Sequence, residues 1–476
     1  MVSIKQSRLE HWLPAILLLM SILATLGLVY ASVVPLNYIP LSPKDTYLRW
    51  KNIPWNNISL YSRSDWIANA IVVIPSAFFL AGAIDAGRRS RWPLIIASPL
   101  IFLVLASLVL VIELVQVWFP PRTVSQNDIF AGWCGAAIGI AMWFILGRSL
   151  VWALDKFLKY ESPWDRMRWI VGATCIASLF YTIYPFDFVL SREEFLQKFS
   201  EGRLHLGLEE RLVFRLEGLK GLVVAAAKVL PFGILIGLSR SGTGIFRPLV
   251  LLAVVAIALE LVQIPIYTKY ASTLEAIAGI IGGWGGWCIA RTHKTWTGWL
   301  DTSWIWLVAW LGWSFTLVLA FNLRYDSILM SGEILTERWR KFFVPPLLRY
   351  YYASEYAAFS NLAGKIGVFM ILGVLWGMVG WTKARRFTSF RFWFGLVLAL
   401  ILGIAIEVMQ VYLPPMIADA TDIGIYGLGY FLGYVATAIV FGERGGGTAN
   451  CSHNRNENQC QESVQHDLAS TYPDEA

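Results

Sequence analysis

Long apolar runs dominate this sequence, and they constrain the fold more than any other feature. A helix needs about 20 apolar residues to cross a bilayer core, and twelve runs of about this length follow one another along the chain. Only 15% of the 476 residues are charged and the mean hydropathy is +0.56, whereas soluble proteins carry about 25% charged residues. A soluble enzyme, a disordered protein and a disulfide-rich secreted module are therefore excluded. The predicted fold is an all-α polytopic transmembrane bundle with about twelve spans, near residues 13–34, 66–84, 94–118, 129–147, 169–184, 219–238, 248–266, 274–290, 304–321, 361–381, 393–413 and 423–441.

The loops between the runs differ in positive charge, and this difference predicts how the chain threads the membrane. Basic residues gather after every second run, as in segments 88–91 and 148–168. Basic loops stay on the cytoplasmic side of a membrane, so we expect both termini to be cytoplasmic. The three long loops, 35–64, 185–217 and 322–360, are then expected to face outward.

The C-terminal segment 442–476 is polar, which predicts a disordered cytoplasmic tail. Cys451 and Cys460 lie in it near two histidines, in a spacing that matches no zinc site. The net charge of +7 is small and spread over many loops, which argues against a nucleic-acid partner. No P-loop, nucleotide fingerprint or Ser/His/Asp order stands out. We therefore predict no metal and no cofactor.

A Glu-x-x-Gln motif occurs three times at a constant spacing. Its glutamates are Glu113, Glu260 and Glu407, separated by 260 − 113 = 407 − 260 = 147 residues. A second acid follows each glutamate after 15 residues, and a pair of glycines follows each acid in register. The second acids are Asp128, Glu275 and Asp422.

Three copies of one four-helix unit explain this spacing. In each unit the first helix is expected to run outward, followed by a long outer loop, an inward helix, a basic loop, an outward helix, a short outer turn and a last inward helix. This plan differs from the two halves of six helices in major-facilitator transporters. The predicted units comprise residues 1–160, 161–300 and 301–441, followed by the tail at 442–476.

The motif of the first unit resembles the VanZ-like family. The matching positions are Asn69, Pro75, Glu113, Gln116, the turn Phe119-Pro120-Pro121-Arg122, Asp128 and Gly139. The second and third units have Ala225 and Lys365 at the position of Asn69, and all three units lack the asparagine that the family often has three residues after the acid. On this resemblance, the chain is identified as three tandem VanZ-like units.

The resemblance implies a multi-pass protein of the bacterial cytoplasmic membrane with a role in the cell envelope. The member that gives the family its name is linked to teicoplanin resistance, and some relatives are linked to envelope or exopolysaccharide functions. The implied partners are membrane lipids, an envelope glycan or lipid-linked substrate, and envelope-synthesis proteins. The family supplies no established catalytic residues to transfer.

The residue types of the motif suggest a polar site at the outer interface. Glu113 and Gln116 lie on one helix face, and Asp128 opens the next helix from the same side, so the two carboxylates are expected to face each other. The helix dipole favours an anion at Asp128 and disfavours one at Glu113. Arg122 is expected to anchor the turn, to pair with Asp128 or to bind a phosphate. The candidate ligand-binding residues of the three units are Asn69, Glu113, Gln116, Arg122, Asp128, Glu260, Gln263, Lys269, Glu275, Glu407, Gln410 and Asp422.

Two interpretations of this acid–amide pattern stay open. Ionisable residues in membrane helices are costly and often functional, which favours a ligand pocket. A structural clasp between helices would recur in every unit, as this pattern does. Lys228 and Lys365, each inside an apolar helix, are expected to snorkel, to form a buried ion pair with a glutamate of their unit, or to contact a substrate.

The predicted function is to bind or handle a lipid-linked, glycan or amphipathic glycopeptide-like molecule at an outer-face polar pocket. One alternative is a membrane enzyme that uses Glu113 as general acid and Asp128 as base or nucleophile on a glycan or phospholipid. The other is a non-catalytic scaffold of an exopolysaccharide or envelope complex. The sequence favours a protein that is not an enzyme over the enzyme alternative.

Overall fold

The computed structural model describes residues 2–55, 60–159, 163–205, 216–239, 244–292, 302–322, 332–353, 355–384, 389–413 and 416–441. Helices make up nearly all of these ranges, with one short pair of strands. The prediction of an all-α polytopic bundle is therefore confirmed. The predicted tail at 442–476 lies outside the described residues.

The helices fall into three consecutive groups. Group 1 comprises α1 (Val2–Val33), α2 (Pro43–Lys51), α3 (Leu60–Asp85), α4 (Trp92–Gln116), α5 (Gln126–Met142), the π-helical turn η1 (Trp143–Gly147) and α6 (Arg148–Lys159). Group 2 comprises α7 (Pro163–Ile183), α8 (Arg192–Ser200), β1 (Leu204–His205), α10 (Leu216–Ser239), α11 (Phe246–Gln263), β2 (Ala271–Ser272) and α12 (Thr273–Arg291). Group 3 comprises α14 (Ser303–Asn322), α15 (Gly332–Phe342), α16 (Leu348–Tyr351), α17 (Glu355–Ala384), α18 (Ser389–Tyr412) and α19 (Ala420–Phe441).

Eleven candidate spans in the described ranges are long and apolar enough to cross a membrane, one fewer than the sequence predicted. The missing one is α7, which has 21 residues but contains Asp165, Arg166 and Arg168 near its start; these charges lower its mean hydropathy. Helix α7 nevertheless packs against α10, α11 and α19. Arg166 donates a hydrogen bond to the carbonyl of Ile439 in α19 at 2.6 Å. The same arginine that lowers the hydropathy of α7 therefore joins α7 to α19.

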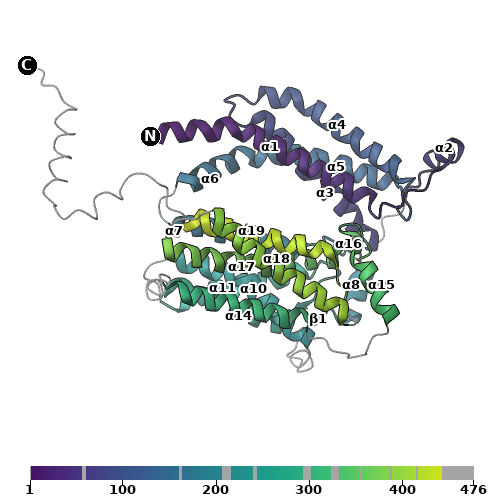
Figure 1. The fold of residues 1–476 in the computed structure, drawn as a ribbon. Coiled ribbons are helices and arrows are strands. Elements are labelled where there is room, and N and C mark those ends of the chain that lie inside the picture. The colour runs from purple at the N-terminus through teal and green to yellow at the C-terminus, as the bar shows by residue number, and fades with distance from the viewer. Residues whose placement is uncertain are drawn as a thin grey trace, which may run out of the picture.

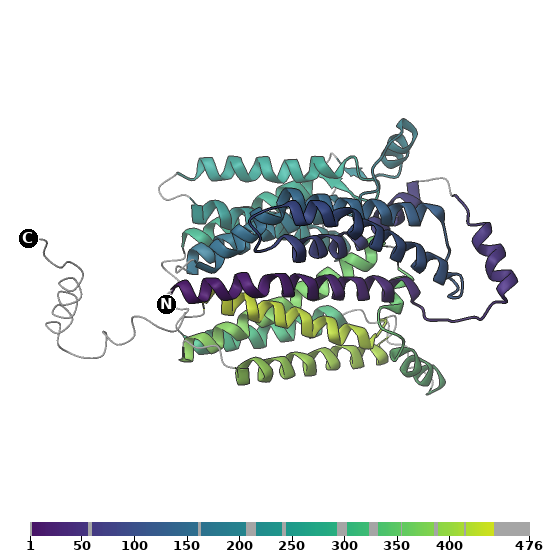
Figure 2. The same ribbon diagram turned by 90° about the horizontal axis from the view of Figure 1, so that it is seen from above.

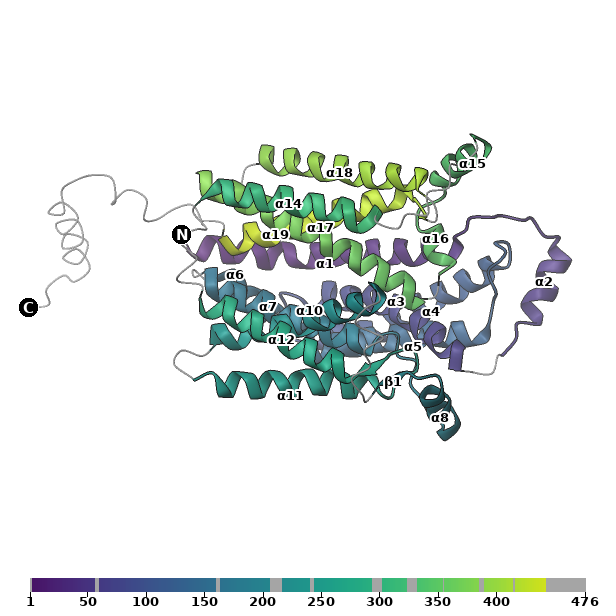
Figure 3. The same cartoon turned by 90° about the horizontal axis from the view of Figure 1, so that it is seen from below.

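The long helices run side by side, and the two ends of the bundle differ (Figure 1). The short helices α2, α8 and α15 lie at one end, which we call the short-helix end, and the N-terminus lies at the opposite end (Figures 1 and 3). Helices α1, α3, α4 and α5 of group 1 lie above the helices of groups 2 and 3 in Figure 1, and in the view from above (Figure 2) α1 projects onto the space between these two groups. The short helices of the three long loops that the sequence predicts to face outward thus lie at one end.

Glycines bring the second and fourth long helices of each group into backbone contact. A Cβ atom on Gly135 of α5 would lie 2.2 Å from the carbonyl oxygen of Ala70 in α3. The matching contacts are Gly282 with Ala226 (2.2 Å) and Gly429 with Ile366 (2.5 Å). Small residues let membrane helices approach this closely. These contacts fix the register of α3 on α5, of α10 on α12 and of α17 on α19.

Side chains at the short-helix end join the groups. Arg63 of α3 forms two hydrogen bonds, at 2.9 and 3.0 Å, with the carboxylate of Glu194 in α8. The hydroxyl of Tyr30 in α1 donates to the carbonyl of Pro346, just before α16, at 2.7 Å. Group 1 therefore contacts groups 2 and 3 at the end where the motif residues lie.

Candidate functional site

The motif glutamate of each group is buried and accepts a backbone hydrogen bond from a residue twelve positions later. Glu113, Glu260 and Glu407 are 7%, 8% and 0% exposed. Their carboxylates accept the backbone N–H groups of Ser125, of Ser272 at 3.2 Å and of Asp419 at 2.9 Å, respectively.

The donor in each case stands at the start of the group's last long helix. Ser125 and Ser272 are the N-cap residues of α5 and α12, and Asp419 directly precedes α19. The first N–H groups of a helix have no partner within the helix. The glutamate of the third long helix therefore satisfies a free donor at the turn and ties two helices together, as the clasp interpretation expects.

In the described contacts, the second acid of group 1 accepts hydrogen bonds from neutral groups. The amide nitrogen of Asn69 in α3 donates to Oδ1 of Asp128 at 2.7 Å, and the hydroxyl of Ser125 donates to Oδ2 at 2.6 Å. The backbone N–H of Asp128 returns a bond to the Ser125 hydroxyl at 3.1 Å. Ser125 thus contacts both Asp128 and Glu113, which brings the two predicted carboxylates of group 1 together.

One oxygen of Glu113 differs from every other motif carboxylate oxygen described here. Oε2 of Glu113 is buried and has no hydrogen-bond partner among the described residues. Gln116, predicted to share its site, instead donates to the carbonyl of Ser32 in α1 at 3.1 Å. Group 1 therefore holds a buried carboxylate with unused hydrogen-bonding capacity.

In group 2, a lysine stands between the two acids. Nζ of Lys228 lies 3.4 Å from Oε1 of Glu260 and 3.8 Å from Oε2 of Glu275. Gln263 donates to the same Glu260 oxygen at 3.0 Å. Both oxygens of Glu260 are therefore occupied, since the other accepts from Ser272.

Lys269, which aligns with Arg122 in sequence, lies beside this site and points elsewhere. Its ammonium donates to the carbonyl of Tyr181 at 3.1 Å and sits 4.6 Å from the centre of the Tyr181 ring. Burial lowers the pKa of Lys269 to about 8, helped by the neighbouring charge of Lys228. Lys269 therefore anchors the turn after α11 to the end of α7.

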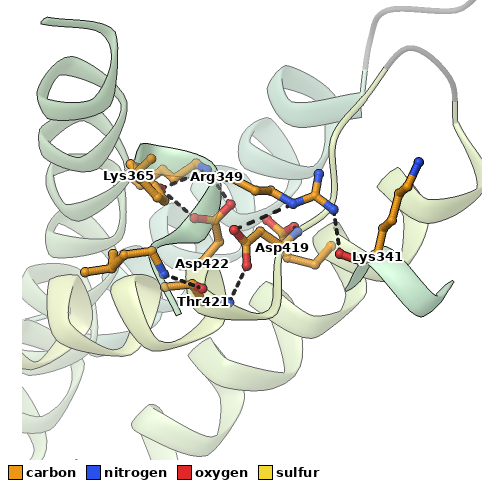
Figure 4. A network of polar contacts seen from close by, with 9 residues as sticks. Lys341, Arg349, Lys365, Asp419, Thr421 and Asp422 are labelled. Atoms are coloured by element: carbon orange, nitrogen blue, oxygen red, sulfur yellow. Dashed lines mark hydrogen bonds and ion pairs between the residues drawn. The ribbon is translucent and has the colours of Figure 1, made fainter. Parts of the chain in front are cut away.

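In group 3, the acids join a polar network of α15, α16, α17 and α19 (Figure 4). Lys365 of α17 forms an ion pair with Oδ2 of Asp422, and the hydroxyl of Tyr350 donates to Oδ1 of Asp422 at 2.6 Å. Arg349 lies 3.8 Å from Asp419 (Figure 4). The charges of these acids are thus matched by cations of the same group.

Both carboxylate oxygens of Glu407 accept hydrogen bonds. The hydroxyl of Tyr426 donates to its Oε1 at 2.7 Å, and Oε2 accepts the N–H of Asp419. Gln410 is buried, and its backbone carbonyl accepts a bond from Arg338 at 2.5 Å. Glu407 is therefore buried and hydrogen-bonded within the chain, and it is not placed to contact a ligand.

The two intramembrane lysines therefore follow the ion-pair alternative. Lys228 pairs with the motif glutamate Glu260, as that alternative expects. Lys365 pairs with Asp422, the second acid, and not with a glutamate. The difference arises because Lys228 lies three residues beyond the Ala225 position, and so one helix turn further along.

Groups that the sequence did not reveal cap the C-terminal ends of the motif helices. The indole of Trp50 in α2 donates to the carbonyl of Leu114 at 3.1 Å. Lys198 of α8 donates to three carbonyls at the end of α11, and Arg338 of α15 does the same at the end of α18. The carbonyl end of a helix carries partial negative charge, so a cation there is favourable. The short helices in the three long loops therefore hold the motif helices in place.

A signal for these caps is present in the sequence but weak. Lys198 and Arg338 each stand in a short, mostly polar segment of a long loop, where several other basic residues offer the same chemistry. Only the fold shows which cation reaches the helix end, and Lys198 is 0% exposed. Burial lowers the pKa of Lys198 to about 8.

A hollow of about 400 Å³ lies at the short-helix end of group 1. It lies between α2 and the turn after α4, and two guanidinium groups stand among mostly apolar side chains. Its lining residues are Leu48, Arg49, Asn52, Ile53, Pro54, Val117, Pro120, Arg122 and Val124.

The two arginines of the hollow are held differently. Arg49 is exposed on α2. Arg122 is half-buried, donates to the carbonyls of Val34, at 2.8 Å, and Ala31, and lies 4.1 Å from the centre of the Tyr351 ring. Arg122 therefore ties the turn after α4 to the end of α1, and it forms no ion pair with Asp128 in the described contacts.

The fold and its buried acid sites define an all-α, multi-pass membrane protein. Residues 13–147 match the family model described as VanZ/LLP1, and this range extends from α1 through η1. That part of the chain is similar to the VanZ-like family. No curated protein and no solved structure gives a significant match. Among the described residues, no group of three or more His, Cys, Asp or Glu side chains is arranged to hold a metal ion.

Proposed function

We propose that this protein is a cell-envelope protein of the bacterial cytoplasmic membrane that binds an anionic amphipathic molecule, lipid-linked or glycan-bearing, at the short-helix end of group 1. The loop charges support an outward orientation of this end, with both termini in the cytoplasm. The observation that carries the proposal is the hollow lined by Arg49 and Arg122, because it lies in the domain that matches the family model.

The chemistry of the hollow suits a phosphate or another anion attached to an apolar chain. A guanidinium presents paired donors that match phosphate oxygens. Leu48, Ile53 and Val124 supply apolar surface beside the two guanidiniums. Binding sites that combine apolar walls with a few polar groups are typical of amphipathic ligands.

We further propose that the three groups are copies of one VanZ-like unit, and that the first copy is the one that binds a ligand. The clasp between a glutamate and a helix start occurs in all three groups, as do the glycine contacts at a spacing of 147 residues. Lysines neutralise the acids of the second and third groups. These two groups then serve as scaffold, and group 1 binds the ligand.

The enzyme alternative receives less support from the geometry. A base or nucleophile needs a free oxygen within reach of a substrate. Both oxygens of Asp128 accept a hydrogen bond, from Asn69 and from Ser125, which weakens Asp128 as a base or nucleophile, although each oxygen keeps a second lone pair that can accept another donor. The scaffold alternative and contacts with envelope-synthesis proteins stay predictions.

Binding of a short-chain polyisoprenyl phosphate to the full chain in lipid nanodiscs tests the proposal. Arg49→Gln is expected to weaken binding about tenfold, because a hydrogen bond to a charged group is lost. Lys44→Gln is the matched control, since Lys44 is a cation on the same short helix that does not line the hollow. Equal affinity in the wild type and Arg49→Gln, or equal losses in the two variants, would contradict the assignment of the hollow.

A further inference from the structure

The three motif glutamates have the same clasp but differ in what their second oxygen contacts. The second oxygen of Glu260 accepts from Lys228 and Gln263, and that of Glu407 accepts from Tyr426. The second oxygen of Glu113 is buried and has no partner among the described residues. Because Glu113 is only 7% exposed, bulk water does not fill this role as it would at a surface.

The glycine contacts show which residues of groups 1 and 3 stand at the same place. Gly135 lies against the carbonyl of Ala70, and Gly429 lies against that of Ile366. The residue before Ala70 is Asn69 and the residue before Ile366 is Lys365. Group 1 therefore has a neutral amide where group 3 has an ammonium.

Both side chains at this place reach the second acid. Asn69 donates to Asp128 at 2.7 Å, and Lys365 pairs with Asp422. In group 2, Lys228 reaches both acids from one helix turn further along. An ammonium from the chain thus enters the acid site in two groups and is replaced by an uncharged amide in the first.

The replacement of a lysine by Asn69 changes the charge balance around Glu113. Asp128 and Asp65 both act on Glu113 as like charges, and Arg122 is the cation that opposes them. The guanidinium of Arg122 is already engaged by the carbonyls of Val34 and Ala31. A buried carboxylate without a cation or proton carries a large desolvation cost, so the acid site of group 1 favours the entry of a positive group.

We propose that the acid site of group 1 binds the primary ammonium group of a ligand, between Glu113 and Asp128, in the place that Lys365 fills in group 3. This inference rests on the proposed function and narrows it to a headgroup that carries an anion and a primary amine, such as phosphoethanolamine. Arg122 lines the hollow and acts electrostatically on Glu113, so the inference places the anion of the headgroup at Arg122 and its ammonium between the two acids. Asp128 and Asn69 are partly exposed, which leaves the site open from the short-helix end.

The test compares three short-chain phospholipids that differ in headgroup. Binding of dihexanoyl phosphatidylethanolamine, phosphatidylcholine and phosphatidylglycerol to the full chain in detergent is measured by ligand-induced shifts in melting temperature. The ethanolamine form is expected to bind about tenfold more tightly than the others, because the hydrogen bonds of its ammonium to carboxylates are charge-assisted. The choline form is the close control, because its trimethylated nitrogen has no N–H to donate.

Two variants change the charge of the site, one by removing a carboxylate and the other by adding an ammonium. Glu113→Gln keeps the shape and removes the charge, so the preference for ethanolamine is expected to disappear. Asn69→Lys places an internal ammonium at the position of Lys365, so the melting temperature without lipid is expected to rise and the preference again to disappear. Glu260→Gln in group 2 is the matched control and is expected to keep the preference.

The outcomes separate this inference from the proposed function. Equal binding of the ethanolamine and glycerol forms, lost in Arg49→Gln, would overturn the ammonium site and leave the anionic headgroup proposal standing. Absence of binding by all three lipids would overturn the ammonium site, and absence of polyisoprenyl phosphate binding as well would overturn the proposed function. A preference for ethanolamine that survives Glu113→Gln would also overturn the ammonium site.

Discussion

Groups 1 and 3 have the same helix contacts around their acid sites but balance the charges of these sites differently. In both groups the motif glutamate accepts a backbone N–H at the start of the last helix, and glycines press that helix onto a neighbouring backbone. In group 3, Lys365 neutralises Asp422 from within the chain, whereas in group 1 the described contacts of Asp128 are with the neutral groups of Asn69 and Ser125. One helical frame can therefore carry either a closed ion pair or a site that still accepts a cation.

The largest expected effect comes from removing the lysine of group 3. Asp422 is 2% exposed, so Lys365→Met leaves a buried charge alone and is expected to lower the free energy of unfolding by about 3–5 kcal/mol. The measurement is denaturant unfolding of the purified chain in detergent. Adding Asp422→Asn to the same variant is expected to recover most of the loss, because the unpaired charge is then absent.

The counterpart in group 1 sharpens this comparison. Asn69→Leu removes a hydrogen bond to Asp128 without removing a cation, and is expected to lower the free energy of unfolding by only about 1.5–3 kcal/mol. A loss in Asn69→Leu as large as that in Lys365→Met would show that the two sites do not differ in charge balance.

A medium effect, equal in both groups, is expected at the glycine contacts. A Cβ atom would lie 1.9 Å from the carbonyl oxygen of Met370 at Gly433 and 2.2 Å from that of Ala70 at Gly135. Gly433→Ala and Gly135→Ala are each expected to lower the free energy of unfolding by about 1–3 kcal/mol through overpacking. Gly424→Ala in α19 is the control, because no atom lies within 4 Å of its Cβ position; alanine there is expected to be neutral or slightly stabilising.

A pH dependence is expected to arise from the cap in group 2. Burial lowers the pKa of Lys198 to about 8 from its ordinary value of 10.5. Between these two values the unfolded chain binds more protons than the folded chain, so stability rises with pH over this window. The melting temperature of the wild type is expected to rise from pH 8 towards 10.5, and Lys198→Met is expected to start lower and rise less.

The same pH measurement compares the caps of groups 1 and 2. Group 1 has Trp50 as its cap, which does not titrate, so Trp50→Phe is expected to leave the slope of the pH profile unchanged. Lys269, whose pKa burial also lowers to about 8, contributes to the slope that remains in Lys198→Met. Identical slopes in the wild type and Lys198→Met would argue that Lys198 keeps an ordinary pKa in the folded chain.

The sequence was informative where the pattern is local or periodic. Apolar runs located eleven of the spans, and the spacing of Glu113, Glu260 and Glu407 located three sites that have the same backbone clasp. The run that becomes α7 falls below the others because Arg166 and Arg168 stand in it. Arg166 forms its hydrogen bonds with carbonyls of α19, which lies far away in sequence, so this role could not be predicted from the local pattern.

The parts of the site that could not be predicted depend on contacts between distant segments. Lys228 and Lys365 were recognised as unusual, but three roles stayed open because the partner of an intramembrane lysine is set by helix packing. The caps by Lys198 and Arg338 were missed because a loop offers many cations and the sequence does not show which one reaches a helix end. The hollow beside Arg49 was missed because it forms between α2 and the turn after α4.

The backbone contact between α3 and α5 also limits how group 1 can move. Where a glycine touches a carbonyl directly, no flexible side chain lies between the helices to absorb a rotation or a slide. Helices α3 and α5 therefore behave as one stiff strut along this contact. Helix α2 and the turn after α4 border the hollow, and they are joined to the strut by side chains such as Gln126, whose amide donates to the carbonyl of Ile53 at 2.8 Å. Side-chain contacts of this kind can rearrange, so α2 can shift relative to the strut without breaking its backbone contact.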